Sequence, residues 1–435
     1  MGLRMNRLRE ALRALRHRNF RLFFTGQIIS LVGTWMQTVA ESWLVYRLTG
    51  SAAKLGMVGF CSQIPVFLIA PIGGAAADRS NRRRTLVFTQ SAAMVLALAY
   101  ALLTLTHRIQ VWQIFVLAAL LGVVNGFDIP TRQAFVVDMV GKEDLMNAIA
   151  LNSSMFNGAR IIGPAVAGVL VASVGEGWCF FINSMSYIAV IAGLLMMAVP
   201  HRRPGAATGS PARRIAEGFR FAATTGPITG LLLLLGLVSL AGMPYAVLMP
   251  IFADRVLHGG ARTLGLLMSA SGAGALLGAF TLAFRRGVRG LGKWVAVAAG
   301  GFGAALIAFS FSHAVWVSAA LLVPVGYALM VEMASSNTLI QAMVPDELRG
   351  RVMAVYSMMF MGMAPIGALL AGFAAHAFGA AETVAGGGVL CIAGAAAFAR
   401  KLPSLRTEGR RLILAQQAVA GEPSSGVTGT NVRSE

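Results

Sequence analysis

Long uninterrupted apolar stretches constrain the fold of this chain more than any other feature of its sequence. A helix needs about 20 apolar residues to cross the hydrocarbon core of a bilayer. A soluble domain could not bury this many apolar stretches, because single cores stop growing at about 250–300 residues. The runs are continuous and do not alternate in short segments, which argues against a transmembrane β-barrel. Twelve candidate spans lie near residues 21–45, 54–77, 85–106, 111–133, 146–172, 178–199, 227–252, 263–284, 293–312, 315–340, 351–374 and 381–399.

The basic residues indicate how these spans are oriented. The 435 residues include 36 Lys+Arg and 17 Asp+Glu, for a formal net charge of +19. With the N-terminus placed inside, 29 basic residues fall in cytoplasmic segments and five in external ones. This asymmetry follows the positive-inside rule. We therefore expect both termini to be cytoplasmic, and no basic patch remains that needs a nucleic-acid partner.

A Gly-, Pro- and Arg-rich segment divides the chain into two halves of six spans each. We predict an all-α polytopic membrane protein whose twelve transmembrane helices form two pseudo-symmetric bundles. The arm preceding the first span is basic and amphipathic, which suits either the membrane surface or a simple topology anchor. The expected units are the cytoplasmic arm 1–20, the N-terminal bundle 21–199, the cytoplasmic linker 200–226 with a short amphipathic helix near 211–222, the C-terminal bundle 227–400 and a disordered tail 401–435.

An internal echo supports two related halves. Asp128 stands twelve residues before the end of a Met-Val pair at Val140, and Glu332 stands twelve residues before a Met-Val pair ending at Val344. Both landmarks repeat at an offset of 204 residues, and an acidic loop follows each. Related halves of this kind face each other around a central path, with the substrate near the midplane.

The loop between the second and third spans resembles the signature of the major facilitator superfamily at the same place. It places a glycine and an acid before a basic cluster, with Asn81 where the superfamily has glycine, and asparagine tolerates a positive φ. The resemblance covers essentially the whole chain, and it implies that this loop braces an inner gate. The alternative is a loop that sets topology only. The residues concerned are Gly74, Asp78, Arg79, Asn81, Arg82, Arg83 and Arg84.

The fifth span is similar to the glycine-proline motif of antiporters in this superfamily. Its residues are Gly158, Gly163, Pro164 and Gly168, with Gly158 one residue farther away than usual. The resemblance implies export, while plain helix packing by small residues is the alternative. Residues 43–51, 128–134 and 147–152 also resemble the bacterial branch that contains the enterobactin exporter and related drug efflux proteins.

Three acids lie at apparent membrane depth, where a charge costs several kcal/mol and is usually functional. Asp128 and Arg132 are four residues apart on one helical face, so they can pair, and Arg160 is a second possible partner for Asp128. Glu41 and Glu332 have no nearby cation in the sequence. We predict them as proton or cationic-substrate sites. The alternatives are a solvated vestibule residue for Glu41 and a structural ion pair for Asp128.

Other chemistries find little support. Cys61, Cys179 and Cys391 sit in apolar runs without a paired spacing, and the six histidines fall in loops or near span ends, so we expect no metal site. No catalytic or nucleotide-binding motif is present, so we expect no enzyme activity and no cofactor beyond the proton gradient. A methionine-dense region comprising Met333, Met358, Met359, Met361 and Met363 suits an adaptable pocket, while lipid-facing or core methionine is the alternative for each residue singly.

These observations favour a secondary active transporter of the bacterial inner membrane. We expect a monomer in contact with membrane lipids that exports small organic molecules, such as drugs or siderophores, by proton-coupled alternating access. An importer or lipid transporter on the same fold is the alternative. A non-transporting membrane sensor is a remote one, because it would not need buried acids.

Overall fold

A computed structural model describes residues 12–198, 211–285 and 287–420. Residues 1–11, 199–210 and 421–435 lie outside this description, and with them most of the predicted arm, the first part of the linker and the end of the tail. The described residues form helices and contain no strand. The expectation of an all-α protein is therefore confirmed for this part of the chain.

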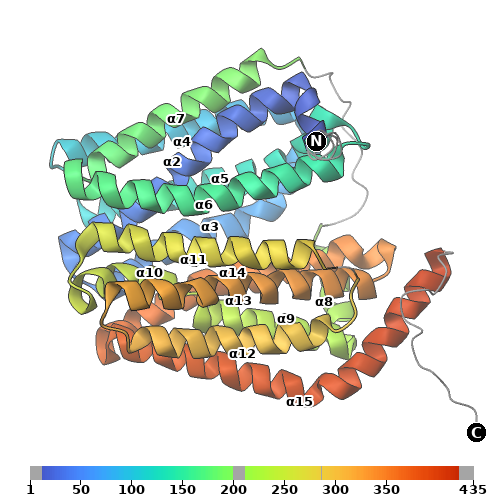
Figure 1. Ribbon diagram of the computed structural model, residues 1–435. Helices are drawn as coiled ribbons and strands as arrows, with labels where there is room; N and C mark the ends of the chain where they lie inside the picture. The colour runs from blue at the N-terminus through green and yellow to red at the C-terminus, as the bar shows by residue number, and fades with distance from the viewer. Residues whose placement is uncertain (1–11, 199–210, 286, 421–435) are drawn as a thin grey trace, which may run out of the picture.

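Long helices follow one another with short connections (Figure 1). A short 3₁₀ turn, η1 (Arg13–Arg16), precedes them. The helices of the first half are α2 (Arg18–Thr49), α3 (Ala52–Arg79), α4 (Arg82–Leu105), α5 (Val111–Val140), α6 (Leu145–Val174) and α7 (Glu176–Met196). Those of the second half are α8 (Pro211–Thr224), α9 (Gly226–Leu237), η2 (Val238–Gly242), α10 (Tyr245–Ile251), η3 (Phe252–Val256), α11 (Gly260–Ala283), α12 (Leu291–Ser310), α13 (Val315–Met343), α14 (Asp346–Phe378) and α15 (Ala380–Ala420).

Eleven helical segments of the described chain are long and apolar enough to span a membrane. Each corresponds to one of the predicted spans, with the segments α9 to η3 together forming the seventh. The remaining prediction, residues 21–45, corresponds to α2, which is 32 residues long. Its middle carries Gln27, Gln37 and Glu41, all buried, and these polar side chains lower its apolar character.

The helices form two bundles, an N-terminal one (α2–α7) and a C-terminal one (α9–α15), which lie one above the other in Figure 1. Two helix pairs, α3 with α14 and α6 with α11, make the main contacts between them. Glycines allow the close approach. A Cβ at Gly56 would lie 2.9 Å from Cα of Gly372, and one at Gly168 would lie 3.0 Å from Cα of Gly265.

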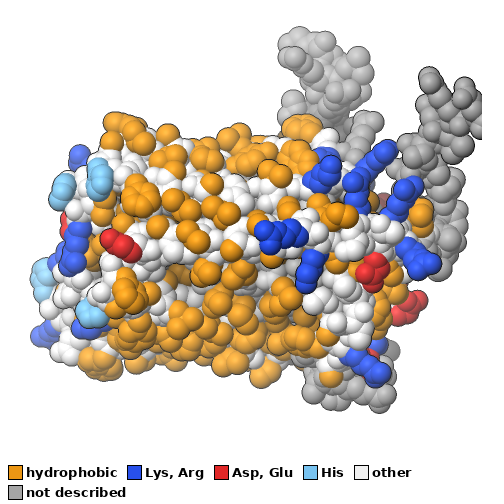
Figure 2. Space-filling view, turned by 90° about the horizontal axis from the view of Figure 1, so that it is seen from below, with side chains coloured by type: hydrophobic (Ala, Val, Ile, Leu, Met, Phe, Trp, Pro, Cys, Tyr) orange, Lys and Arg blue, Asp and Glu red, His pale blue; other side chains and the backbone are white. Residues whose placement is uncertain are grey.

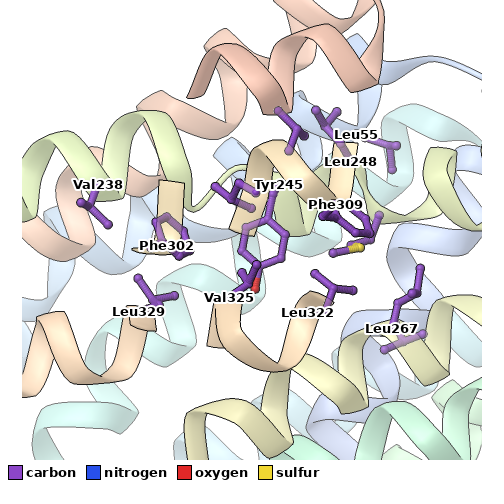
Figure 3. Close-up of a cluster of buried hydrophobic side chains, with 14 of the residues drawn as sticks. Leu55, Val238, Tyr245, Leu248, Leu267, Phe302, Phe309, Leu322, Val325 and Leu329 are labelled. Carbon is purple, nitrogen blue, oxygen red and sulfur yellow. The ribbon is translucent and has the colours of Figure 1, made fainter. Parts of the chain in front are cut away.

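The seventh span is not one regular helix. Two π-helical segments, η2 and η3, flank the short helix α10, and Pro244 stands just before α10. Proline removes a helical hydrogen bond, and π-bulges occur mostly at functional sites. The large buried side chains around α10 include Tyr245, Leu248 and Phe302, which belong to the same buried cluster as Leu55 of the N-terminal bundle; Leu248 lies beside Leu55 in Figure 3.

The two ends of the molecule differ in charge. We call the end with the α3–α4 and α5–α6 connections the basic end, and Lys and Arg side chains gather there in Figure 2. Between the ends Figure 2 shows a broad band of hydrophobic side chains. Exposed apolar residues within the long helices include Val297 at 74% exposure and Leu370 at 56%. Apolar side chains exposed over such an area suit contact with lipid.

The final helix differs from the expected disordered tail. Helix α15 continues through residues 401–420. Leu405, Leu412 and Ile413 pack against the C-terminal bundle in this stretch. Their apolar side chains stabilise the helix in a segment whose content of Gly, Ser, Thr and Glu had suggested disorder.

Candidate functional site

A cavity of about 280 Å³ lies between the two bundles. Helices α2, α3, α6, α10 and α11 line it. Its wall is mostly apolar and contains two charged residues, one of each sign. The side chains that characterise it are Trp35, Glu41, Arg160, Met243, Tyr245 and Met268. A concave apolar site with a few polar groups is the usual form of a small-molecule binding site.

Glu41 places its carboxyl between this cavity and helix α4. The residue is 9% exposed and lines the cavity. On the other side, its Oε1 lies 3.1 Å from the hydroxyl oxygen of Tyr100. Tyr100 also lies 3.0 Å from the backbone carbonyl of Ile114 at the start of α5. No sequence spacing could have predicted this contact, because Tyr100 looks like any other aromatic residue in an apolar span.

Arg160 faces the same cavity from α6. Its guanidinium lies 5.7 Å from the ring centroid of Trp35, in a cation–π contact. The ion pairs of the described residues include none between Arg160 and an acid. The possible second partnership with Asp128 is therefore not present in this conformation, and Arg160 lines the cavity instead.

Asp128 belongs to a separate, well-satisfied network inside the N-terminal bundle. Its Oδ1 accepts hydrogen bonds of 2.8 Å from both Thr89 and Gln90 of α4. Its Oδ2 lies 3.4 Å from Nε of Arg132, the ion pair that the spacing of four residues predicts. The residue is 3% exposed and is not part of the cavity wall. This geometry ties α4 to α5.

Glu332 lies deep in the C-terminal bundle. The residue is fully buried on α13, and its Oε1 accepts a hydrogen bond of 3.2 Å from Ser336. Its Oε2 has no hydrogen-bond partner among the described residues. A buried charge without a partner is costly, so the arrangement favours a carboxyl that holds a proton. Glu332 does not line the central cavity.

The basic loop after α3 ties helices of the N-terminal bundle together. Arg82 pairs with Asp138 of α5 at 2.8 Å and donates to the carbonyl of Ala134 at 2.9 Å. Arg83 donates two hydrogen bonds of 2.6 Å to the carbonyls of Leu194 and Leu195, at the end of α7. Both arginines thus lock α4 to its neighbours at the basic end.

The rest of this loop departs in part from the expectation. The side chain of Asp78 lies outside the described part of the structure, and Arg79 is exposed. Asn81 does not adopt a positive φ: its φ is −73°. It is instead the N-cap of α4, and its side chain accepts a hydrogen bond from the backbone N–H of Arg84. Asparagine is a preferred N-cap residue, which explains its presence where glycine was expected.

The glycines of α6 pack against two different helices. A Cβ at Gly163 would lie 2.9 Å from the carbonyl oxygen of Val32, on α2, whereas Gly168 faces α11. A Cβ at Gly158 would meet nothing within 4 Å, so this position makes no close packing contact. Pro164 lines the central cavity beside Arg160. The motif therefore lets α6, which forms one wall of the cavity, pack closely against α2 of its own bundle and α11 of the other.

A latch that sequence reasoning missed joins the bundles at the end opposite the basic end. The hydroxyl of Tyr46, on α2, donates a hydrogen bond of 2.7 Å to Asp254, on η3. Arg255 donates one of 3.0 Å to the carbonyl of Gly50. Its guanidinium also lies 5.9 Å from the centroid of the Tyr46 ring. The partners are far apart in sequence, so only the fold reveals them.

A second cavity, of about 370 Å³, lies between α3 and α14 toward the basic end. Met358 and Met361 line it together with Phe67 and Arg351. Two methionines of the dense region thus do face a cavity. The central cavity has three methionines of its own, which come from other parts of the chain: Met243, Met249 and Met268.

Two helical bundles around a mostly apolar central cavity are the architecture of the major facilitator type of secondary transporter. Residues 10–419 match the model of the family described as transmembrane secretion effector. The chain belongs to this family of the major facilitator superfamily.

Relatives with names of known transporters match most of the chain. The staphyloferrin A transporter of Staphylococcus aureus is 27% identical over 377 residues, which are 85% of this chain and 93% of that protein. The multidrug efflux pump Tap of Mycolicibacterium fortuitum is 27% identical and covers 80% of this chain and 87% of its own. The enterobactin exporter EntS of Citrobacter koseri is 26% identical, with 82% and 85% covered.

Solved structures share the fold at low sequence identity. A bacterial homologue of the lysosomal transporter Spinster has a TM-score of 0.65 at 15% identity, covering 92% of this chain and 98% of its own. The nucleoside transporter NupG has a TM-score of 0.66 at 13% identity, covering 91% and 98%. These likenesses establish the fold alone.

Proposed function

We propose that this protein exports small, partly apolar organic molecules across the bacterial inner membrane in exchange for protons. The observation that carries the proposal is Glu41, whose carboxyl stands in the wall of the apolar cavity between the two bundles. A carboxyl in such a place can take a proton from one side and release it to the other when the cavity changes its access.

The charge distribution supports an orientation with the basic end in the cytoplasm and both termini inside. In that orientation the latch of Tyr46, Asp254, Gly50 and Arg255 closes the external side of the cavity. Opening this latch while the basic end closes gives the alternation of access that a two-bundle transporter needs.

The cavity also indicates the kind of substrate. Trp35, Met243 and Met268 offer apolar and polarisable contact, while Glu41 and Arg160 offer one charge of each sign. Methionine side chains adapt to ligands of different shape. The named relatives transport siderophores or several drugs, and both kinds of molecule combine apolar and polar parts.

Three acids are candidates for coupling, and their geometry ranks them. Glu41 alone of the three faces the central cavity. Glu332 follows, because it is buried without a cation among the described residues. Asp128 comes last, since both of its oxygens already have partners within the N-terminal bundle.

Everted membrane vesicles test the proposal. We expect substrate addition to release protons from energised vesicles that contain the wild-type protein. We expect no release when Glu41→Gln, Asp128→Asn and Glu332→Gln are combined. Proton release that survives in the triple variant would contradict proton coupling through these acids.

Direction and substrate need a separate experiment. Expression in a host that lacks its own efflux pumps should raise tolerance to a cationic dye such as ethidium, or raise the amount of siderophore in the medium. Accumulation of either compound inside the cells would instead support an importer on the same fold.

A further inference from the structure

The hydroxyl of Tyr100 lies between two oxygen atoms that belong to different helices. One is Oε1 of Glu41 on α2, at 3.1 Å, and the other is the carbonyl oxygen of Ile114 on α5, at 3.0 Å. Tyr100 itself belongs to α4 and is fully buried. Three helices of the N-terminal bundle therefore meet at a single hydroxyl group.

Proton counting restricts how these contacts can be made. A phenol carries one proton, and a carbonyl oxygen can only accept. If Tyr100 donates to Ile114, the contact with Glu41 is a hydrogen bond only when Glu41 donates, which requires a protonated carboxyl. If Glu41 is ionised, its carboxylate can only accept, so Tyr100 must donate its single proton to Glu41. The hydrogen bond from Tyr100 to the carbonyl of Ile114 is then lost.

We propose that Tyr100 is a positioning residue that transmits the protonation state of Glu41 to the α4–α5 connection. This inference rests on the proposed role of Glu41 in proton exchange. With Glu41 protonated, a continuous chain of hydrogen bonds runs from α2 through Tyr100 to the start of α5. With Glu41 ionised, the Tyr100 proton turns to the carboxylate and the link to α5 is released.

The groups around the pair are consistent with this exchange. Arg160 of α6 and Tyr245 of α10 face the same cavity as Glu41, and Cys61, on α3, packs against the buried cluster that contains Tyr100. Arg160 is the one cation among these described neighbours, and it lies on the cavity side. The Tyr100 hydroxyl is thus the donor that an ionised Glu41 finds on the protein side.

The Tyr100 hydroxyl also affects the relative stability of the ionised and protonated forms of Glu41. A hydrogen bond to a carboxylate is stronger than one between neutral groups. Removing the Tyr100 hydroxyl therefore weakens the ionised form of Glu41 more than the protonated form. The pH at which transport is half-maximal should move upward in Tyr100→Phe. The matched control is Tyr327→Phe, because the hydroxyl of Tyr327, on α13, makes no hydrogen bond among the described contacts.

Infrared difference spectroscopy of the purified protein tests the contact directly. Glu41→Gln should remove one protonated-carboxyl C=O band from the pH difference spectrum. Tyr100→Phe should keep that band and shift its frequency upward, because the carboxyl loses its hydrogen-bond partner. Tyr327→Phe should leave it unchanged. A band at the wild-type frequency in Tyr100→Phe would overturn the proposal.

Transport measurements separate this inference from the function on which it rests. If Glu41→Gln abolishes proton-coupled transport but Tyr100→Phe keeps the wild-type pH profile, the Tyr100 proposal fails and the role of Glu41 stands. If Glu41→Gln leaves coupling intact, the role of Glu41 fails first. An upward shift of the profile in Tyr100→Phe, absent in Tyr327→Phe, supports both.

Discussion

Tyr46 and Asp254 lie 208 residues apart in the sequence, yet the tyrosine hydroxyl donates a hydrogen bond of 2.7 Å to the aspartate carboxylate. One partner belongs to α2 of the N-terminal bundle and the other to η3 of the C-terminal bundle. The bond therefore exists only while the two bundles are close at this end. This hydrogen bond therefore stabilises the conformation in which the latch is closed relative to the one in which it is open.

Substitution Tyr46→Phe should shift the protein toward the conformation that is open at the latch. A hydrogen bond to an exposed carboxylate contributes about 1 kcal/mol, so the ratio of open to closed molecules should rise about fivefold. Spin labels at the exposed positions Lys54 and Arg262, one in each bundle, measure the change. In Tyr46→Phe, a larger fraction of the molecules should show the longer distance between the two labels. Tyr327→Phe serves as the control, and an unchanged distance distribution in Tyr46→Phe would remove the latch from the mechanism.

The described end of the arm, residues 12–17, docks on Asp144 at the start of α6 through a pH-dependent contact. His17 Nε2 lies 2.7 Å from Asp144, and Arg13 forms an ion pair with the same carboxylate. The hydrogen bond with His17 and the charge of Arg13 hold the pKa of Asp144 below its ordinary value of 3.8. Because the pKa of Asp144 is lowered on docking, the contact stabilises docking fully at pH values above the ordinary pKa of 3.8. This stabilisation is lost as the pH falls through the lowered pKa of the docked state.

Asp144→Asn should therefore undock the arm at neutral pH, whereas the wild-type arm should undock only in strong acid. Hydrogen exchange of residues 12–20 measures this as faster exchange in the variant at pH 7. Glu143→Gln is the matched control, because Glu143 contributes only its backbone carbonyl to Arg13. Equal exchange rates in Asp144→Asn and wild type would show that the carboxylate does not hold the arm.

The contact between Gly168 and Gly265 sets the distance between the bundles. Gly168→Val should force α6 and α11 apart and destabilise the protein by about 2–3 kcal/mol, as overpacking does. Gly158→Ala is the control on the same helix, since a Cβ there meets nothing within 4 Å. Thermal unfolding in detergent compares the two. A Gly168→Val protein as stable as Gly158→Ala would contradict the tight packing.

The pair of buried Asp128 and half-buried Arg132 should matter more for stability than a pair at the surface. Asp128→Asn leaves Arg132 without its partner, and breaking a buried pair costs about 3 kcal/mol. Asp346→Asn breaks the exposed pair with Arg349 and should cost less than about 1 kcal/mol. Denaturant titration measures both. Equal small losses would show that Asp128 is not a structural anchor.

The sequence was sufficient to predict the spans because bilayer thickness imposes their length. Even α2, whose polar residues weaken its apolar signal, lies within three to four residues of the predicted boundaries 21–45. The pair of Asp128 and Arg132 was also predictable, because helix geometry fixes neighbours four residues apart. Local rules of this kind operate within one helix.

Contacts between helices could not be predicted in the same way. Tyr100 meets Glu41 across 59 residues, and nothing in the pattern around position 100 distinguishes it from a lipid-facing aromatic. The seventh apolar run likewise gave no sign that η2 and η3 interrupt it. The predicted positive φ at Asn81 was wrong for a local reason, because asparagine is favoured both at helix N-caps and at turn positions with a positive φ.

The central claim is that Glu41 exchanges the proton that drives transport. The most direct measurement places purified wild-type and Glu41→Gln protein in liposomes and imposes a pH gradient on a transported substrate. Our account predicts gradient-driven accumulation with the wild type, and none with Glu41→Gln, which still exchanges preloaded substrate across the membrane. Accumulation by Glu41→Gln at the wild-type rate would contradict the account.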